Sequence, residues 1–188
     1  TIADYLSHDI RTGTIPTTLP EFDAAEKEVK ERLEGLVNNK GIHSVDYYHK
    51  QLGNIMWNKC GMSRNEKGLK EAIEEIAALR EDFWKNVSVP GSAYELNPEL
   101  EKAGRVADFL ELGELFAKDA LDRNESCGGH FREESVEVGG PQDGEALRDD
   151  ENYAYVAAWE YKGKPSEAVL HKEQLEFNDI KLTQRSYK

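Results

Sequence analysis

The sequence predicts a mainly α fold: an up-and-down bundle of three to four helices, followed by a Gly-rich loop and a short C-terminal β hairpin or extension. Apolar residues recur every three or four positions in four successive segments, which is the spacing of amphipathic helices. Breaks that contain Gly or Pro separate these segments. The composition changes after Asn124, where Gly and later aromatic residues become frequent. With 188 residues, the chain is long enough for one domain with a buried core.

The N-terminal part combines an irregular start with a first helix. Residues 1–20 are rich in Thr and contain two Pro, which predicts an extended or irregular lead-in. Helical spacing then begins and predicts a helix over 22–39. Its apolar positions are Phe22, Ala25, Val29, Leu33, Leu36 and Val37. Gly41 follows, and Gly readily takes the left-handed conformation that ends many helices.

Two further helices are expected over 44–60 and 66–87. Ser44 precedes the first and Asn65 the second. Both residue types are preferred at helix N-caps, because their side chains accept a hydrogen bond from a backbone N–H that has no helical partner. Apolar residues recur at helical spacing in both segments, and the sequence VPGS at 89–92 closes the second.

The fourth helix is expected over 98–124, at the centre of the bundle. Asn97 provides a cap, and Pro98 suits the first helical position, where no N–H donor is needed. The apolar residues cover more than one narrow stripe of this helix, which is typical of a helix with neighbours on several sides. They are Phe109, Leu110, Leu112, Leu115, Phe116, Ala117, Ala120 and Leu121.

The last third of the chain is expected to be irregular and then β-structured. Residues 125–150 hold several Gly and one Pro, and so long a loop is uncommon unless it carries function or contacts something. The aromatic-rich segment 153–161 is expected to pair with 167–172 as a hairpin. We therefore expect one domain, with a helical bundle and its lead-in over 1–124 and a loop with a β-containing extension over 125–188.

The charge balance and the apolar content limit the function classes. Asp and Glu total 37 against 24 Lys and Arg, so the formal net charge is -13. We expect no nucleic-acid binding and no direct membrane contact, because both depend on basic surfaces. No run of 18 apolar residues is present, so no membrane insertion is expected. The chain opens on Thr1 instead of Met, and we expect it to be a piece of a longer protein.

No motif for catalysis, cofactor binding or metal binding stands out. The five His do not form a helical i,i+4 pair or an HExxH motif; they are His8, His43, His49, His130 and His171. Ser126 and Cys127 lie beside Gly128 and Gly129, but no GxSxG, GxGxxG or Walker pattern surrounds them. We therefore expect no catalytic, cofactor-binding or metal-binding residue in this chain.

Two other function classes stay open on the residues alone. One is an acidic helical interaction module, unrelated to flavoproteins, that docks a partner through its loop and tail. The other is a small metal enzyme built from His130, Glu133 and the carboxylates of 149–151. The acidic run at 149–151 lacks the spaced oxygen ligands of a calcium loop. Such a run more often caps an element or pairs with Arg132 or Arg148.

Four segments in order resemble the succinate dehydrogenase/fumarate reductase flavoprotein family. ESCGGHFR at 125–132 and RDDENY at 148–153 are similar to the ESRGxHxR and RDDxxW stretches of that family. MWNKCGMSRNEKGL at 56–69 resembles a helix junction of the family, and LEL at 110–112 resembles its helix before the loop. The ending at 175–188 looks like the C-terminus of such subunits. Cys127 stands where the family usually has Arg, and Tyr153 where it usually has Trp.

The resemblance covers essentially the whole chain but only the C-terminal part of the family's subunit. It implies a subunit that interconverts succinate and fumarate with FAD and passes electrons to an iron–sulfur subunit. The FAD and substrate sites would lie outside this chain, so the isolated domain is expected to hold no cofactor and to be inactive. The implied partners are the FAD-binding domain of the same subunit and the iron–sulfur subunit. The implied location is cytoplasmic, peripheral on the cytoplasmic face of the membrane through partner subunits.

The resemblance also assigns a role to the loop. Within it, Glu125, His130, Arg132, Asp149 and Asp150 match the family's motifs. They are expected to set the shape of the loop and to form an interface with the flavin domain. The change to Cys at 127 removes a fixed cation with several donors. This departure fits a divergent bacterial branch of the family.

Overall fold

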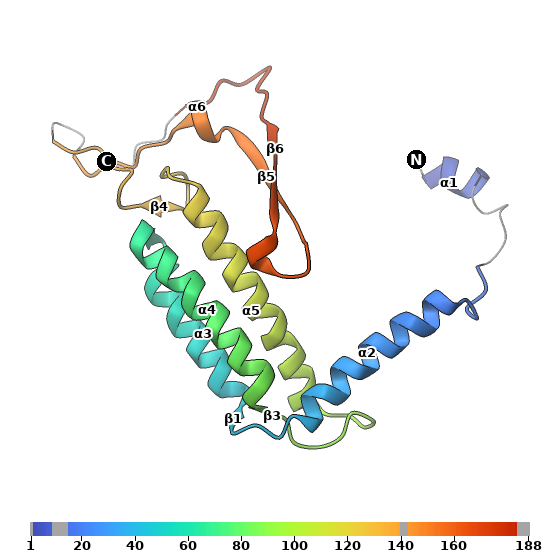
Figure 1. Cartoon of the computed structure of the whole chain (residues 1–188). Helices are drawn as coiled ribbons and strands as arrows, with labels where there is room; N and C mark the ends of the chain where they lie inside the picture. The colour runs from blue at the N-terminus through green and yellow to red at the C-terminus, as the bar shows by residue number, and fades with distance from the viewer. Residues whose placement is uncertain (1, 9–14, 140–142, 184–188) are drawn as a thin grey trace.

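A computed structural model of the chain describes residues 2–8, 15–139 and 143–183 (Figure 1). The described residues are mainly helical, and a small antiparallel hairpin follows the helices, which confirms the expected fold class. The helices are α1 (Ile2–His8), α2 (Pro20–Asn38), α3 (Val45–Lys59), α4 (Glu66–Asn86), α5 (Pro98–Asp122) and α6 (Asp150–Tyr153).

The three expected N-caps are confirmed. Each cap side chain accepts a hydrogen bond from the backbone N–H three residues later, which satisfies one of the donors that a helix start leaves free. The pairs are Ser44 with Tyr47 at 3.2 Å, Asn65 with Gly68 at 2.8 Å and Asn97 with Leu100 at 3.1 Å. The predicted helix starts are therefore accurate because they rest on local side-chain chemistry.

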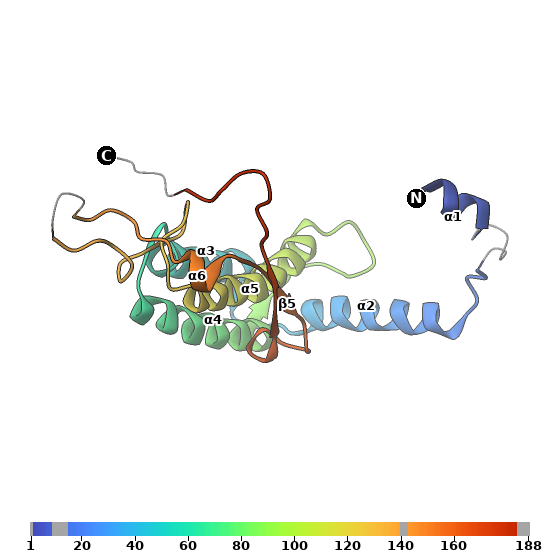
Figure 2. The ribbon, with the colours of Figure 1, turned by 90° about the horizontal axis from the view of Figure 1, so that it is seen from above.

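Helices α3, α4 and α5 form the bundle and lie side by side in both views (Figures 1 and 2). Helix α5 packs against both α3 and α4, which confirms its expected central place. Gly113 of α5 allows a close approach to α3, since a Cβ there would lie 3.2 Å from Leu52 Cδ1 and 3.4 Å from Met56 Sδ. The core also includes Tyr48 and Phe83, whose rings meet edge to face at 5.2 Å.

Two short parallel strand pairs close the two ends of the bundle. At one end, β1 (His43–Ser44) pairs with β3 (Val87–Ser88). At the other end, β2 (Ser63–Arg64) pairs with β4 (Phe131–Arg132). The pairs arise because antiparallel helices bring the segment before α3 beside the segment after α4, and the α3–α4 connection beside the chain that leaves α5. The sequence analysis did not predict these pairs.

Helix α2 diverges from the bundle (Figure 1). Leu36, near its C-terminal end, is its only buried residue, and residues 20–32 are all exposed. The bundle is thus three-helical, at the lower end of the expected three to four helices. The expectation that 1–20 is irregular was wrong for 2–8, which form α1. That stretch contains no Gly or Pro, which both lie further along the lead-in.

The predicted C-terminal hairpin is confirmed and packs on α5. Strands β5 (Tyr155–Glu160) and β6 (Val169–Gln174) pair antiparallel, and the 3₁₀ turn η2 (Pro165–Glu167) lies between them. Trp159 Nε1 donates to Asp119 of α5 at 2.7 Å, and the Tyr155 hydroxyl lies 3.0 Å from the Asp122 carboxylate. Among the described residues, no helix has the length and apolar character needed to cross a membrane.

Candidate functional site

The candidate site residues gather where the Gly-rich loop leaves the C-terminal end of α5, near β4 and α6 (Figure 1). The last carbonyls of a helix have no partner within the helix and carry partial negative charge. A chain that leaves α5 at this point must therefore supply donors, and preferably cations, to these carbonyls. The Gly-rich loop contains such donors and cations.

Arg132 supplies the donors to the end of α5. Its side chain is only 2% exposed, and its Nη1 donates to the carbonyls of Ala120 at 3.1 Å, Leu121 at 3.3 Å and Arg123 at 3.2 Å. Its Nε donates to Glu134 at 3.0 Å. Arg132 therefore acts as a C-terminal cap for α5 from ten residues further along the chain, instead of facing solvent.

The β2–β4 pair and Ser126 hold Arg132 in place. Arg64 of β2 pairs in register with Arg132 of β4. The buried hydroxyl of Ser126 accepts a hydrogen bond from Arg132 N at 2.9 Å and donates one to Arg132 O at 3.2 Å. The Ser126 hydroxyl therefore satisfies backbone groups of the loop. These contacts explain how a two-residue strand in an otherwise irregular loop can hold a buried cation in one position.

His130 is neutral in this network. Its Nε2 lies 2.8 Å from the carbonyl of Arg123, which can only accept, and its Nδ1 lies 2.8 Å from Arg64 Nη1, which can only donate. The proton must therefore be on Nε2, and Nδ1 must be the acceptor. Burial lowers the pKa of His130 below its ordinary value, and the charges of Arg64 and Arg132 act in the same direction.

Glu125 ties the end of α5 to the segment before the hairpin. Its carboxylate is 3% exposed and accepts a hydrogen bond from Arg123 Nη1 at 2.7 Å. The other oxygen accepts from the backbone N–H of Asp149 at 3.0 Å. The Arg123 guanidinium continues to the carbonyl of Tyr153 at 3.1 Å and lies 5.0 Å from the centroid of the Tyr155 ring. An ion pair between a buried carboxylate and a partly exposed arginine thus joins three parts of the chain.

Asp149 and Asp150 lie at the rim of this network. Asp149 is the N-cap of α6 and accepts from the backbone N–H of Asn152 at 3.2 Å. Asp150 forms an ion pair with Arg148 and is exposed. The acidic run therefore caps an element and pairs with an arginine, as such runs commonly do.

The structure brings Glu125, His130, Arg132 and Asp149 together and leaves Asp150 at the surface. Sequence reasoning missed Arg64 and Arg123, which complete the network. Arg64 lies inside the 56–69 segment that was similar to the family, so its position carried a signal. Arg123 had none, because its role depends on where α5 ends and on which backbone groups surround it.

The geometry favours neither the metal-enzyme alternative nor catalysis by a Ser126–His130 pair. Both ring nitrogens of His130 are engaged, and the Glu133 carboxylate accepts from Ser63 and Asn65. Within the described parts of the chain, no group of three or more His, Cys, Asp and Glu is placed to hold a metal ion. Ser126 bonds to the Arg132 backbone and has no hydrogen bond to His130 among the described contacts.

Comparison with known proteins decides the family. A family model described as "Fumarate reductase flavoprotein C-term" matches residues 49–187, which is well over half of the chain. The chain belongs to this family. The fumarate reductase flavoprotein family is an oxidoreductase family, and the matched part is its C-terminal helical region. This result confirms the resemblance and excludes a module unrelated to flavoproteins.

Individual flavoprotein relatives support the same family and show how much of it this chain represents. The fumarate reductase flavoprotein subunit of Haemophilus influenzae is 27% identical over 163 residues, which is 86% of this chain and 24% of the relative. The subunit of Helicobacter pylori is 31% identical over 131 residues, which is 70% of this chain and 18% of the relative. The chain therefore spans about a quarter or less of these relatives.

Solved fumarate reductase and succinate dehydrogenase structures share the fold. A chain of E. coli quinol fumarate reductase matches with a TM-score of 0.69 and 20% identity, over 92% of this chain and 28% of that chain. A chain of the Mycobacterium smegmatis Sdh1 complex in the apo form matches with a TM-score of 0.68 and 23% identity, over 95% and 27%. At these identities, the likeness is one of fold.

Proposed function

We propose that this chain is the C-terminal helical domain of a flavoprotein subunit that interconverts succinate and fumarate. In that subunit FAD would exchange a hydride with the substrate and pass electrons to an iron–sulfur subunit. The match of 49–187 to the C-terminal part of the fumarate reductase flavoprotein carries this proposal. The FAD and substrate sites would lie in the rest of the subunit, and this domain would supply packing surface.

The loop network supports a structural role for the candidate site. Glu125, His130 and Arg132 bond to the backbone or side chains of this domain, so they would fix the shape of the loop. Asp150 and Cys127 are exposed at the same end of the bundle. They would be the side chains that reach the flavin domain. Bundle and extension would form one domain overall.

The partners follow from the same assignment. They would be the FAD-binding domain of the same subunit and the iron–sulfur subunit. The solved relatives named above are a quinol fumarate reductase and an Sdh1 complex, which supports a place in a larger assembly. The subunit would be cytoplasmic and would sit on the cytoplasmic face of the membrane through other subunits. The net charge of -13 favours no direct contact with anionic lipid or nucleic acid.

A flavin and activity measurement tests the proposal. The purified 188-residue chain should show no flavin absorbance and no dye-linked succinate oxidation. The polypeptide of the parent reading frame, which includes this region, should show both. A yellow 188-residue protein with activity would place the sites inside this chain and overturn their proposed location. A complete polypeptide without flavin and without succinate or fumarate turnover would overturn the function itself.

A further inference from the structure

His130 occupies a position that it can keep only while its ring is neutral. Its Nδ1 accepts a hydrogen bond from Arg64 Nη1 at 2.8 Å, and its Nε2 donates to the carbonyl of Arg123 at 2.8 Å. A guanidinium stays protonated in proteins, so Arg64 can only donate. A second proton on the ring would therefore place an N–H and a positive charge directly against a cation.

The charged groups around the ring all reinforce this conflict. Three arginines from three parts of the chain act against a positive charge on it: Arg64 of β2, Arg123 after α5 and Arg132 of β4. The neighbouring carboxylates interact with these arginines, and they belong to Asp119, Glu125 and Glu134. They keep the cations in place beside the ring, so a proton on His130 would enter an already positive surrounding.

The His130 ring closes the Gly-rich loop onto the bundle. Beside it, two backbone hydrogen bonds join β4 to the α3–α4 connection: Phe131 N to Met62 O at 3.1 Å, and Glu133 N to Arg64 O at 2.8 Å. Cys127 and His130 also exchange backbone hydrogen bonds at 2.8 and 3.1 Å. A displaced ring would therefore carry the Gly128–Gly129 turn with it.

We propose that His130 is a pH-sensitive switch: protonation of its ring breaks the bond to Arg64 and separates the Gly-rich loop from β2, while the helical bundle stays folded. Among the described residues, the hydrophobic core cluster takes none of its members from 125–139 or 143–150, so the loop can open without loss of the core. This inference goes beyond the proposed function, because the motion belongs to this chain alone and needs neither flavin nor substrate.

Linkage gives the direction of the switch. Burial, and then the neighbouring charges, lower the pKa of His130 in the closed loop below 6.5. An open loop returns the ring to water and to about its ordinary pKa of 6.5. The open loop therefore binds the proton more tightly, and opening becomes more favourable as the pH falls below 6.5. Above that pH the closed loop keeps its full stability.

The opposite end of the bundle offers a matched histidine. There β1 and β3 form a parallel pair of the same length, and His43 occupies the first position of β1. Its ring stacks on Tyr47 at 4.1 Å, and a positive charge on it would be favourable to the carboxylate of Asp82. Protonation of His43 therefore does not oppose the strand pair, which makes this residue the control for His130.

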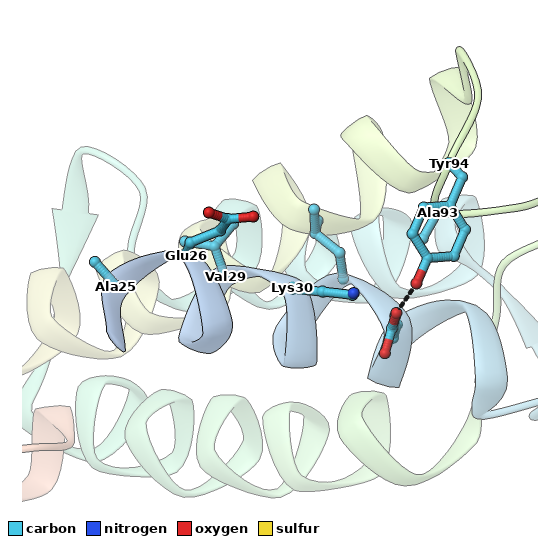
Figure 3. A pocket seen from close by; sticks show the side chains of 8 residues that line it. Ala25, Glu26, Val29, Lys30, Ala93 and Tyr94 are labelled. Carbon is cyan, nitrogen blue, oxygen red and sulfur yellow. Dashed lines mark hydrogen bonds between the residues drawn. The ribbon is translucent and has the colours of Figure 1, made fainter. Parts of the chain in front are cut away.

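The tether of helix α2 shows why burial matters for such a switch. The Tyr94 hydroxyl donates to the Glu34 carboxylate beside a groove of about 460 Å³ between α2 and the α4–α5 connection (Figure 3). Tyr94 is 75% exposed, so water can replace this bond at little cost. Arg64 is instead held by the Gly61 carbonyl at 2.6 Å and by the Phe116 ring, whose centroid lies 4.9 Å from its Cζ. It cannot simply turn away from a charged ring.

Hydrogen exchange followed by NMR at pH 7.5 and 5.5 tests the switch in the 188-residue chain. With rates corrected for the intrinsic effect of pH, the amides of Phe131 and Glu133 should lose protection by at least about threefold at pH 5.5. At both pH values they should be less protected than the amides of α4, because the loop opens before the bundle unfolds.

Two variants and one titration assign the effect to His130. His130→Gln should remove the threefold change, because an amide can donate and accept but does not titrate in this range. His43→Gln should preserve the change. An NMR titration of the His130 ring in the unmodified chain reads its pKa directly, without any substitution. Arg64→Gln should raise that pKa toward 6.5, because it removes the facing cation.

Each contrary result would overturn the switch. These results are a His130 pKa at or above 6.5, unchanged protection of Phe131 and Glu133 at pH 5.5, or a change that persists in His130→Gln. Equal protection of these amides and of the α4 amides would mean that the loop opens only when the whole domain unfolds, which also contradicts the switch. None of these measurements involves flavin or turnover, so the proposed function stands or falls separately.

Discussion

Arg132 shows how one buried cation can stabilise both a helix end and a loop. Its guanidinium presents donors in a fixed plane, and three of its contacts are to carbonyls at the end of α5. The helix dipole adds a favourable interaction with the positive charge at that end. Because the side chain is 2% exposed, no water would replace these donors without rearrangement.

Replacing Arg132 should therefore be costly. Arg132→Ala should lower the free energy of unfolding by about 3 kcal/mol, because buried carbonyls lose their donors and Glu134 loses its partner. Arg132→Lys should recover only part of this loss, since an ammonium cannot match the planar fork. Arg148→Ala is the control: its ion pair with Asp150 is partly exposed and should contribute less than about 1 kcal/mol. Urea unfolding measures all three, and equal losses for Arg132→Ala and Arg148→Ala would contradict the capping role.

His130 should make stability depend on pH. Its folded-state pKa lies below the ordinary value of 6.5 because of burial, so between these two pKa values the unfolded chain binds more protons than the folded one. The contribution of His130 is therefore complete above pH 6.5 and is lost as the pH falls below it. Urea unfolding at pH 7.5 and 5.5 should show a smaller loss of stability in His130→Gln than in the unmodified chain. Identical losses would mean that His130 does not titrate differently on folding.

Glycines at two places in the helical part should respond in opposite ways to the same change. A Cβ on Gly41 would lie 1.9 Å from the backbone oxygen of Asn86, where Gly41 N donates to Val87 O at 3.1 Å. Gly41→Ala should therefore cost about 2 kcal/mol, because the β1–β3 end of the bundle must shift. A Cβ on Gly53, within α3, meets no atom within 4 Å. Gly53→Ala should stabilise the chain by about 0.5–1 kcal/mol, since Ala favours the helix. Thermal unfolding of both variants checks the signs, and a loss of similar size in both would contradict the steric argument.

The helices show which parts of the fold are readable from local sequence. The starts of α3, α4 and α5 were predicted because a cap and an apolar period are local signals. Helix α6 has only four residues, and the strands β1 to β4 at the two ends of the bundle have only two each. Segments this short contain no apolar period from which they could be predicted. The spacing in α2 correctly predicted a helix with an apolar stripe. The spacing could not predict whether the stripe packs on this bundle or on another surface. It shows which side of a helix is apolar, but not what that side contacts.

The whole molecule shows why the candidate site could be only partly predicted. The motifs at 125–132 and 148–153 named residues that do meet in space. Their contacts with Arg64 and with the carbonyls of α5 depend on the bundle bringing β2 beside β4. That arrangement depends on tertiary packing, so it cannot be predicted from the spacing of residues in the sequence. The interface role of these residues stays a prediction, whereas their contacts within the domain are visible.

The one-domain proposal makes a prediction about truncation. A chain that ends at Asn124 would lose the Arg132 cap, the His130 contact and the hairpin that packs on α5. It should unfold with a free energy lower by at least about 3 kcal/mol, because the exposed end of α5 keeps its unpaired carbonyls. Removal of residues 1–19, whose described members are all exposed, should leave the urea midpoint unchanged and serves as the control. If residues 1–124 kept the midpoint of the whole chain, the extension would be an independent appendage. A single shared transition in the 188-residue chain, with a lower midpoint after truncation, would show that the loop and hairpin belong to the same cooperative unit as the bundle.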